Sequence, residues 1–450
     1  MACTYNPEID VLDFLISAFL ITGFLFFASQ KAKSMVQEKP YYRFYVRGLA
    51  FKMVAASAFL FIFVYYYDGG DTLAYHQGAI AMKNLFYENP ARYFELLLSP
   101  ISYENYYNYF SAETCYPPSW MVKKESNFTV IRVASVVQLF LGDSIWATNL
   151  IFARLAYTPL FKLYGLFCSY FVGRENLLAY AFLFMPSVAF WGSGIMKDTI
   201  ALSAICWLLV LFEQVAIQKL RISLARFFGI ALAVYALFIV KTYLLLALMP
   251  GVVIWFNFQR IVKVKSTFVR FVLFPSFFML SLVAVLFFYT RNSGLFGVYG
   301  ADTVLEEAAK VQQDLVREEA YGSNSFDIGK FDPTLAGIAS KIPPALEAGL
   351  FRPYLWEAGG SPTMIMAGFE NLIILIMLIV AIIRKRLFGF VKYLASHPLF
   401  ILSFTFILLL AFSIGLTSAN FGALVRYKVP LVPFLMSILF MSLYSPKNES

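Results

Sequence analysis

The sequence contains few charged residues for its length. Of its 450 residues, 14% are Asp, Glu, Lys or Arg, whereas 60% are hydrophobic, and the mean hydropathy is +0.70. A soluble chain of this length has no means of burying so much apolar surface, so lipid must form part of its solvent. The scarcity of charge therefore excludes an ordinary soluble protein.

The sequence also lacks the motifs of several cofactor classes. Its two histidines and four cysteines form no Cys-x-x-Cys pair or His-rich tract, so neither zinc nor haem is predicted. Cys168 and Cys206 lie in apolar runs, whereas Cys3 and Cys115 could meet outside the membrane, although their spacing does not require it. No Gly-x-x-x-x-Gly-Lys-[Ser/Thr] motif occurs, so ATP hydrolysis within the chain is not expected.

The positive charge has a membrane explanation. The net charge of +9 comes largely from short basic loops between apolar runs, as the positive-inside rule predicts, and nucleic acid is not expected as a partner. The basic loop at 30–47 is predicted to be cytoplasmic, which places the N-terminus outside. The next apolar run then delivers the sequence "DGGDTLAYH" (68–76) to the outer face.

Apolar runs of about 20 residues predict eleven membrane spans and an all-α, polytopic fold. The spans are expected at 11–29, 48–66, 146–170, 177–194, 198–214, 226–240, 243–258, 268–289, 367–383, 398–416 and 429–445. The outer loop at 67–145 contains two amphipathic stretches, 76–98 and 128–141, that are predicted to be helices at the membrane interface.

Four regions are expected along the chain. Residues 1–47 form an N-terminal span and cytoplasmic loop, and residues 48–289 form the main transmembrane module. Residues 290–365, which are hydrophilic, form an extracytoplasmic insertion, and residues 366–450 form the C-terminal spans.

The first cluster of side chains that could take part in catalysis or binding follows the second span. Asp68 and Asp71 lie within a few residues of the membrane exit, with Tyr75 and His76 close behind as candidate substrate-binding residues. A half-desolvated carboxylate is costly unless it meets a cation or takes a proton, so Asp71 is a candidate base. The alternative is a polar turn that caps the next helix.

The second cluster is "MPSVAFWGSGIMKDT" (185–199), where an apolar helix reaches a proline, an aromatic-glycine turn and then Lys197 and Asp198. The turn is also expected outside, so Asp198 is predicted to approach Asp71 as a second carboxylate of one site. Trp191 is a candidate substrate contact, although interfacial anchoring is the commoner role of such a tryptophan. A Lys–Asp pair that only caps a helix remains the alternative.

The third cluster consists of basic residues on the side of the membrane where the positive-inside rule predicts few of them. Lys241, Arg352 and Arg426 are all predicted on or near the outer face, and Glu357 lies close to Arg352 in "LFRPYLWEAGG". Such basic residues suit a lipid phosphate or pyrophosphate. Taken singly, each is more commonly a snorkelling side chain or an ion-pair partner.

Three stretches, in order, resemble the membrane-embedded GT-C glycosyltransferases, the class that includes protein O-mannosyltransferases and the aminoarabinose transferase of lipid A. "GDTLAYHQGA" (70–79) resembles the first outer loop of that class. The stretch 139–200 resembles its next spans and the acid that begins the following helix, and "VRYKVPLVPFL" (425–435) is similar to a late-span Arg-Tyr-x-x-Pro-x-x-Pro pattern. The resemblance covers 48–215 well and the rest loosely.

The resemblance implies a GT-C-like fold and a sugar donor linked to a polyprenyl phosphate or pyrophosphate. Asp71 would take the place of the first-loop catalytic acid and Asp198 that of the second-loop acid, with transfer to a glycan, lipid or protein acceptor outside the cytoplasm. The chain departs from the pattern in its extra N-terminal span and in Thr72, where many mannosyltransferases have a second acid. That departure weakens the case for a metal, and a divalent cation, Mg²⁺ or Mn²⁺, is the only cofactor left open.

The predicted protein is thus a glycosyltransferase of a bacterial inner or plasma membrane, with lipid, donor and acceptor as partners. One alternative is a polysaccharide polymerase or ligase that relies on Arg and His instead of an Asp base. Another is a non-catalytic envelope-assembly protein. A transporter is disfavoured because the charge gathers at the outer rim and no internal repeat is visible.

Overall fold

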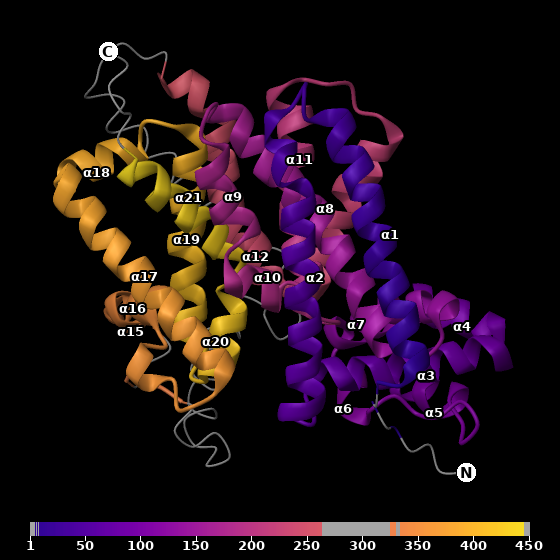
Figure 1. Ribbon diagram of the computed structural model, residues 1–450. Helices are drawn as coiled ribbons and strands as arrows, with labels where there is room; N and C mark the ends of the chain where they lie inside the picture. Colours follow the sequence, from indigo (N-terminus) through magenta and orange to yellow (C-terminus); the bar gives the residue numbers. More distant parts are fainter. Residues whose placement is uncertain (1–4, 6, 8, 263–324, 330–333, 445–450) are drawn as a thin grey trace. The chain divides into compact units, whose positions relative to one another are not determined.

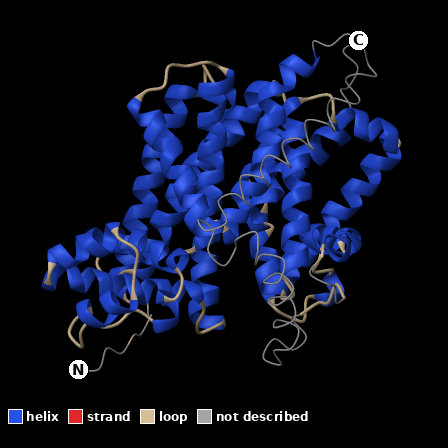
Figure 2. Ribbon diagram, turned by 180° about the vertical axis from the view of Figure 1, so that it is seen from behind, coloured by secondary structure: helices blue, strands red, loops and turns tan. Residues whose placement is uncertain are grey.

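A computed structural model of the chain describes residues 5, 7, 9–262, 325–329 and 334–444. The described residues are helical apart from loops and a single β-bridge between Ser325 and Asn420 (Figure 2). The predicted all-α class is therefore confirmed.

Eight helical segments within the described residues are long and apolar enough to cross a membrane. They are Val11–Met35, Pro40–Tyr66, Ile145–Tyr170, Lys197–Ile217, Leu224–Phe258, Pro362–Lys385, Pro398–Thr417 and Phe421–Leu443. A multi-pass membrane protein follows from these segments. The predicted span at 268–289 lies outside the described residues.

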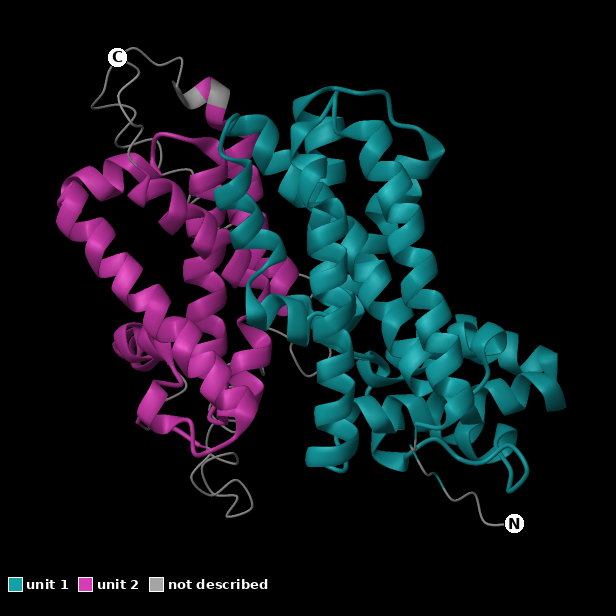
Figure 3. Cartoon of the chain, viewed as in Figure 1, with its two compact units in different colours: residues 1–242 teal, residues 243–450 magenta. Residues whose placement is uncertain are grey.

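The chain divides into two compact units, residues 1–242 and 243–450 (Figure 3). The division falls inside the predicted module at 48–289, so the boundaries predicted at 47, 289 and 365 describe a different partition and stay predictions. Each unit has its own packed helices and is described by itself.

The first unit combines long helices with a cluster of shorter ones. Its helices are α1 (Val11–Met35), α2 (Tyr45–Phe61), α3 (Asp71–Glu88), α4 (Pro90–Leu98), α5 (Tyr103–Tyr109), α6 (Ser119–Val122), α7 (Glu125–Leu141), α8 (Ile145–Tyr170), α9 (Glu175–Leu183), α10 (Pro186–Trp191), α11 (Lys197–Phe212) and the start of α12 (Leu224–Val262). Helices α3 to α7 gather at one end of α1, α2 and α8 (Figure 1). The two amphipathic stretches of the outer loop are therefore helical, as predicted.

The predicted span at 177–194 is wrong as a continuous helix. It is broken into α9 and α10, of nine and six residues, neither of which is long enough to span alone. The cause is Pro186, which begins α10 and holds Met185 in an extended conformation.

The spans predicted at 226–240 and 243–258 correspond to α12. Its backbone leaves helical geometry at Lys241 (φ −154°, ψ 73°), so the helix changes course at the one basic residue of the run "YALFIVKTYLLLAL". This break places the Lys241 side chain in the interior of the first unit, where only 6% of its surface is exposed.

The second unit contains α15 (Leu335–Ser340), α16 (Ile342–Phe351), α17 (Pro362–Lys385), α18 (Leu387–Leu394), α19 (Pro398–Thr417), α20 (Phe421–Tyr427) and α21 (Val432–Leu443). Helix α16 packs closely on the spanning helix α19, because a Cβ added at Gly349 would lie 2.0 Å from the Ala411 carbonyl oxygen. This part of the predicted insertion at 290–365 therefore belongs to the helical bundle of the unit. The more acidic part of the insertion lies outside the described residues.

A buried lysine holds the C-terminal end of α16 in place. Lys428 Nζ donates to the carbonyl oxygens of Leu350 and Arg352 at 3.1 and 2.8 Å and to Asn371 Oδ1 of α17 at 3.0 Å. Helix C-termini attract cations because their last carbonyl groups lack partners in the helix. Lys428 therefore joins three segments of the unit and has a structural role.

Candidate functional site

The turn "DGGD" follows directly from the end of a membrane span. Helix α2 continues into a π-helical segment at Ile62–Tyr66, and the chain then turns through Asp68 (φ 45°) and Gly70 (φ 104°). A Cβ at Gly70 would also lie 3.0 Å from the Phe63 ring. The turn needs glycine at this position, and it brings both aspartates to the same end of the span.

Helix α3 begins at Asp71, which places the carboxylate in the first turn, where the helix dipole favours negative charge. Gly70 is the N-cap residue, so the predicted alternative in which Asp71 itself caps the helix does not describe the turn.

A cavity of about 390 Å³ lies against this turn. The residues that line it come from the N-terminal segment, the turn, α3 and the start of α6: Tyr5, Pro7, Asp68, Gly69, Gly70, Asp71, Leu73, Ala74, Gln77, Pro118 and Trp120. The lining thus combines two carboxylates, an amide and two aromatic rings, and it includes no basic residue. Carboxylate, amide and aromatic groups together suit the hydroxyls and apolar faces of a sugar better than a phosphate.

Asn127 of α7 links α3 to the start of α11. Its Oδ1 atom accepts hydrogen bonds from the Tyr75 hydroxyl at 3.2 Å and from Lys197 Nζ at 2.8 Å. Tyr75 follows Asp71 by one helical turn and Lys197 precedes Asp198, so Asn127 brings the first turns of the two acid-bearing helices close to each other. The two clusters predicted from separate parts of the sequence are therefore neighbours.

Asp198 is paired with Lys241 inside the first unit. Lys241 Nζ lies 2.5 Å from Asp198 Oδ1, and the two side chains are 5% and 1% exposed. The sequence predicts Lys241 near the outer face as a candidate phosphate ligand, whereas the structure corresponds to the ion-pair alternative. A buried pair of this kind neutralises both charges and leaves Asp198 poorly placed to act as a base.

Two buried polar atoms near the turn have no hydrogen-bond partner within the described part of the chain. They are Thr72 Oγ1 and Trp191 Nε1, on side chains that are 0% and 3% exposed. Trp191 packs against Phe59 and Phe63 of the preceding span, so it is a core residue and the interfacial role is wrong. A buried polar atom left unpaired costs about 1–3 kcal/mol, and such atoms are commonly satisfied by water or a ligand.

His76 lies behind the cavity and does not line it. Its Nδ1 atom is 3.0 Å from the hydroxyl of Tyr5, which is a lining residue. Burial lowers the pKa of His76 to about 4, so the imidazole is neutral at pH 7 despite the nearby Asp143. Tyr75 is also buried, and both predicted binding residues support the cavity wall from behind.

In the second unit, Arg352, one of the two predicted anion-binding residues, has acidic partners. Arg352 lies 3.3 Å from Glu347 and 3.5 Å from Glu357, and Glu357 also accepts a hydrogen bond from the Tyr354 backbone at 2.8 Å. Arg426 is half-buried in α20. The Arg352 pairs correspond to the alternative in which this arginine is part of an ion-pair network.

Sequence reasoning missed three residues that organise the first unit. Asn127 of α7 is 7% exposed, and its side-chain oxygen accepts the bonds from Tyr75 and Lys197. Lys52, in the middle of α2, is 1% exposed and donates to the Val188 carbonyl at 3.1 Å. Asp13 of α1 bonds to Ser144 at the start of α8. Lys52 and Asp13 could have been identified from the sequence, because each is a single charged residue within an apolar run. Nothing in the sequence distinguishes Asn127.

The described residues contain no group of three or more His, Cys, Asp or Glu side chains placed to hold a metal ion. Two carboxylates that can accept protons line the cavity, and Lys197 shares the Asn127 side chain with Tyr75 of α3.

The described cysteines include one that is bonded and two that are free. Cys115, in the loop between α5 and α6, is disulfide-bonded, whereas Cys168 and Cys206 are free and buried. Cys3 lies outside the described residues.

Comparison of the chain with protein-family models, with curated proteins and with solved structures finds no match. The resemblance to GT-C enzymes therefore rests on the three short stretches of sequence.

Proposed function

We propose that the protein is a membrane glycosyltransferase of GT-C type that transfers a sugar from a polyprenyl-phosphate or polyprenyl-pyrophosphate donor. The observation that carries the proposal is the cavity in which Asp68 and Asp71 lie together at the exit of a span, with Trp120 and Gln77. A donor of this kind keeps its lipid in the bilayer and its sugar in water. A catalytic carboxylate at the membrane boundary satisfies both requirements.

In the proposed reaction, the acceptor hydroxyl attacks the anomeric carbon of the sugar with inversion. The bond between that carbon and the phosphate oxygen breaks, and the lipid phosphate leaves with the bonding electrons. Asp71, which is half-buried beside the dipole of α3, accepts the hydroxyl proton. Such base catalysis contributes typically about 10²–10⁴-fold in rate.

Lys197 is the best-supported group for the leaving phosphate. It lies at the start of α11 and donates to Asn127, which also holds Tyr75 one turn after Asp71. Lys241 is less available to the phosphate, because its charge is paired with that of Asp198. Its contribution to the site is to hold Asp198, the neighbour of Lys197, in place. Stabilisation of developing charge by a fixed cation in a water-poor site is usually the larger catalytic term.

The disulfide of Cys115 supports an extracytoplasmic position for the loop that carries the cavity. Disulfides persist in oxidising compartments and are rare in the cytosol. The same side is predicted from the basic loop after α1, so two independent features favour transfer outside the cytoplasm.

The test is turnover of a radiolabelled polyprenyl-phosphate sugar by the purified full-length protein. Asp71→Asn should lower kcat at least about 100-fold, because the amide cannot accept the proton, while the unfolding temperature stays unchanged. Asp68→Asn is the matched control in the same turn and should be milder. An Asp71→Asn variant with undiminished turnover would refute the assignment of the base, and wild-type protein without turnover on any such donor would refute the proposed function.

A polymerase that relies on arginine has less support. Arg352 shares its charge with Glu347 and Glu357, so it is less available to a phosphate. If Arg352→Ala stopped turnover and Asp71→Asn did not, the polymerase alternative would replace the transferase.

A further inference from the structure

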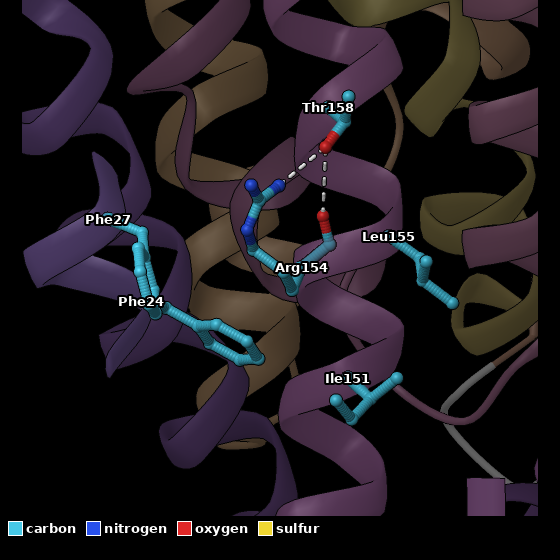
Figure 4. Close-up of a pocket in the computed structure, with 6 residues that line it drawn as sticks. All are labelled: Phe24, Phe27, Ile151, Arg154, Leu155 and Thr158. Atoms are coloured by element: carbon cyan, nitrogen blue, oxygen red, sulfur yellow. Dashed lines mark hydrogen bonds between the residues drawn. The ribbon is translucent and has the colours of Figure 1, made fainter. Parts of the chain in front are cut away.

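A second cavity of the first unit lies between α1 and α8, and its charge is opposite to that of the first. Its volume is about 410 Å³, and it is lined by Phe24 and Phe27 of α1 and by Ile151, Arg154, Leu155 and Thr158 of α8. Figure 4 shows the aromatic side chains of α1 facing the arginine of α8. An arginine within a membrane span is costly and commonly marks a site for an anion.

Arg154 has no acidic partner among the described residues. Its guanidinium donates to Thr158 Oγ1 at 2.5 Å and to the Tyr45 hydroxyl at 3.3 Å, and it lies 5.9 Å from the centre of the Phe24 ring. Hydroxyls and a ring orient the cation without neutralising it. The positive charge of the cavity is therefore uncompensated.

Two further cations lie on the same two helices, C-terminal to the residues that line the cavity. Lys31 of α1 lies 5.6 Å from the Tyr45 ring, and Lys162 of α8 lies 4.0 Å from the Trp207 ring. The two lysines are close enough to repel each other, and neither forms an ion pair in the described part of the chain. Arg154 and Lys31 both lie at Tyr45, and none of the three cations has an acidic partner among the described residues. The cavity and these two lysines together are called the groove.

The distance of Lys31 and Lys162 from the other ends of their helices is close to the thickness of the membrane's hydrocarbon core. At their other ends, α1 and α8 are joined by the bond between Asp13 and Ser144. Lys31 follows Asp13 by 18 residues, and Lys162 follows Ser144 by the same 18 residues. At 1.5 Å per residue this is roughly 27 Å, close to the thickness of the hydrocarbon core, and the side chain of Arg154 bonds to a residue about one turn short of that level.

We infer that this groove binds one anionic phospholipid of the leaflet on the side of the basic loop. Its phosphate lies among Arg154, Lys31 and Lys162, and an acyl chain lies against Phe27 and Leu155. Phe27 and Leu155 are 71% and 57% exposed, so the cavity opens sideways to lipid. A lipid with net negative charge is favoured because the ammonium group of a zwitterionic headgroup would bring a fourth positive charge to the three cations. This site is independent of the proposed transferase reaction.

The test is native mass spectrometry of the full-length protein in detergent with phosphatidylglycerol or phosphatidylcholine of identical acyl chains. The wild type should retain one phosphatidylglycerol per chain, with at least tenfold preference over phosphatidylcholine. Arg154→Met should weaken phosphatidylglycerol binding about tenfold. Lys33→Met is the matched control, because it removes the same charge from α1 two residues from Lys31, on the opposite side of the helix.

Equal retention of the two lipids by the wild type, or unchanged phosphatidylglycerol binding by Arg154→Met, would overturn the inference. Displacement of phosphatidylglycerol by an equimolar polyprenyl phosphate would also overturn it, in favour of a prenyl lipid, and displacement by millimolar inorganic phosphate would reduce the groove to a simple anion site. If Arg154→Met fails to fold, Lys162→Met, whose side chain is exposed, should still weaken phosphatidylglycerol binding several-fold.

Discussion

The two cavities of the first unit are similar in volume, about 390 and 410 Å³, but they differ in how their charge is balanced. At the "DGGD" turn, acids line the cavity, and cations stand behind it, bonded to an amide or a carboxylate. Between α1 and α8, Arg154 lines the cavity, Lys31 and Lys162 lie further along the same helices, and the described residues place no acid beside them. The comparison indicates that the cations behind the first cavity already have partners within the chain, whereas the cations of the groove have no acidic partner among the described residues.

The largest expected effect comes from breaking the buried ion pair between Asp198 and Lys241. Lys241→Met should destabilise the protein by about 3–5 kcal/mol, because Asp198 would remain buried and ionised without its partner. Thermal unfolding in detergent measures the loss. The double variant Asp198→Leu/Lys241→Met should recover at least half of it, and strictly additive losses would show that the pair is not coupled.

The second prediction concerns the loss of stability at low pH. Burial lowers the folded-state pKa of His76 to about 4, below its unfolded value of about 6.5, so the unfolded chain takes up a proton first as the pH falls. The stability contributed by neutral His76 is present above pH 6.5 and is lost between pH 6.5 and 4, by about 3 kcal/mol in all. Unfolding temperatures measured across this range should fall.

His397, the second histidine, also has a pKa lowered to about 4 by burial, so both variants are needed to assign the effect. His76→Asn should flatten the pH profile by about half, and His397→Asn should remove most of the rest. A profile unchanged in His76→Asn would mean that this residue is not buried in its neutral form.

The third prediction tests the turn that places the acids. Gly70→Ala should cost about 1–3 kcal/mol, because φ is 104° and the new Cβ would meet the Phe63 ring at 3.0 Å. Gly69→Ala is the matched control, since the nearest atom to its Cβ would lie 3.8 Å away, and it should cost less than about 0.5 kcal/mol. Equal effects at the two glycines would contradict the turn geometry.

The smallest effect is expected at the uncompensated groove. Arg154→Met in lipid-free detergent should change stability by less than about 1 kcal/mol, because no carboxylate loses its partner. The same unfolding assay used for Lys241→Met gives a direct comparison. A loss as large as that at Lys241 would show that Arg154 is bound to the structure as tightly as a buried ion pair.

Much of the fold could be predicted from hydropathy, but its breaks could not. The runs that became α1, α8 and α19 are long, apolar and bounded by polar loops, so length alone identifies them. The run at 177–194 is equally apolar, yet it divides at Pro186, whose effect depends on whether neighbouring groups satisfy the freed backbone. In this chain Lys52 supplies one such bond, to Val188, from a helix more than a hundred residues earlier.

The candidate site was predicted in part. Asp68 and Asp71 line one cavity because residues so close in sequence share a turn, which local chemistry decides. The partner of Lys241 had to be found in the structure, since 43 residues separate it from Asp198. Arg154 drew no attention in the sequence because a single arginine in a span of 26 residues has no visible counterpart nearby.

The sequence by itself determined that the chain is helical and spans a membrane. The hydropathy and length of a run depend only on its own residues, so they can be read without knowing which segments pack together. The sequence also determined where charge is scarce and where the acidic turn lies. Only the tertiary structure decided which charges are neutralised and which still face a cavity. That outcome depends on distances between segments remote in sequence, and the free energy of a buried charge is set by the few ångströms around it.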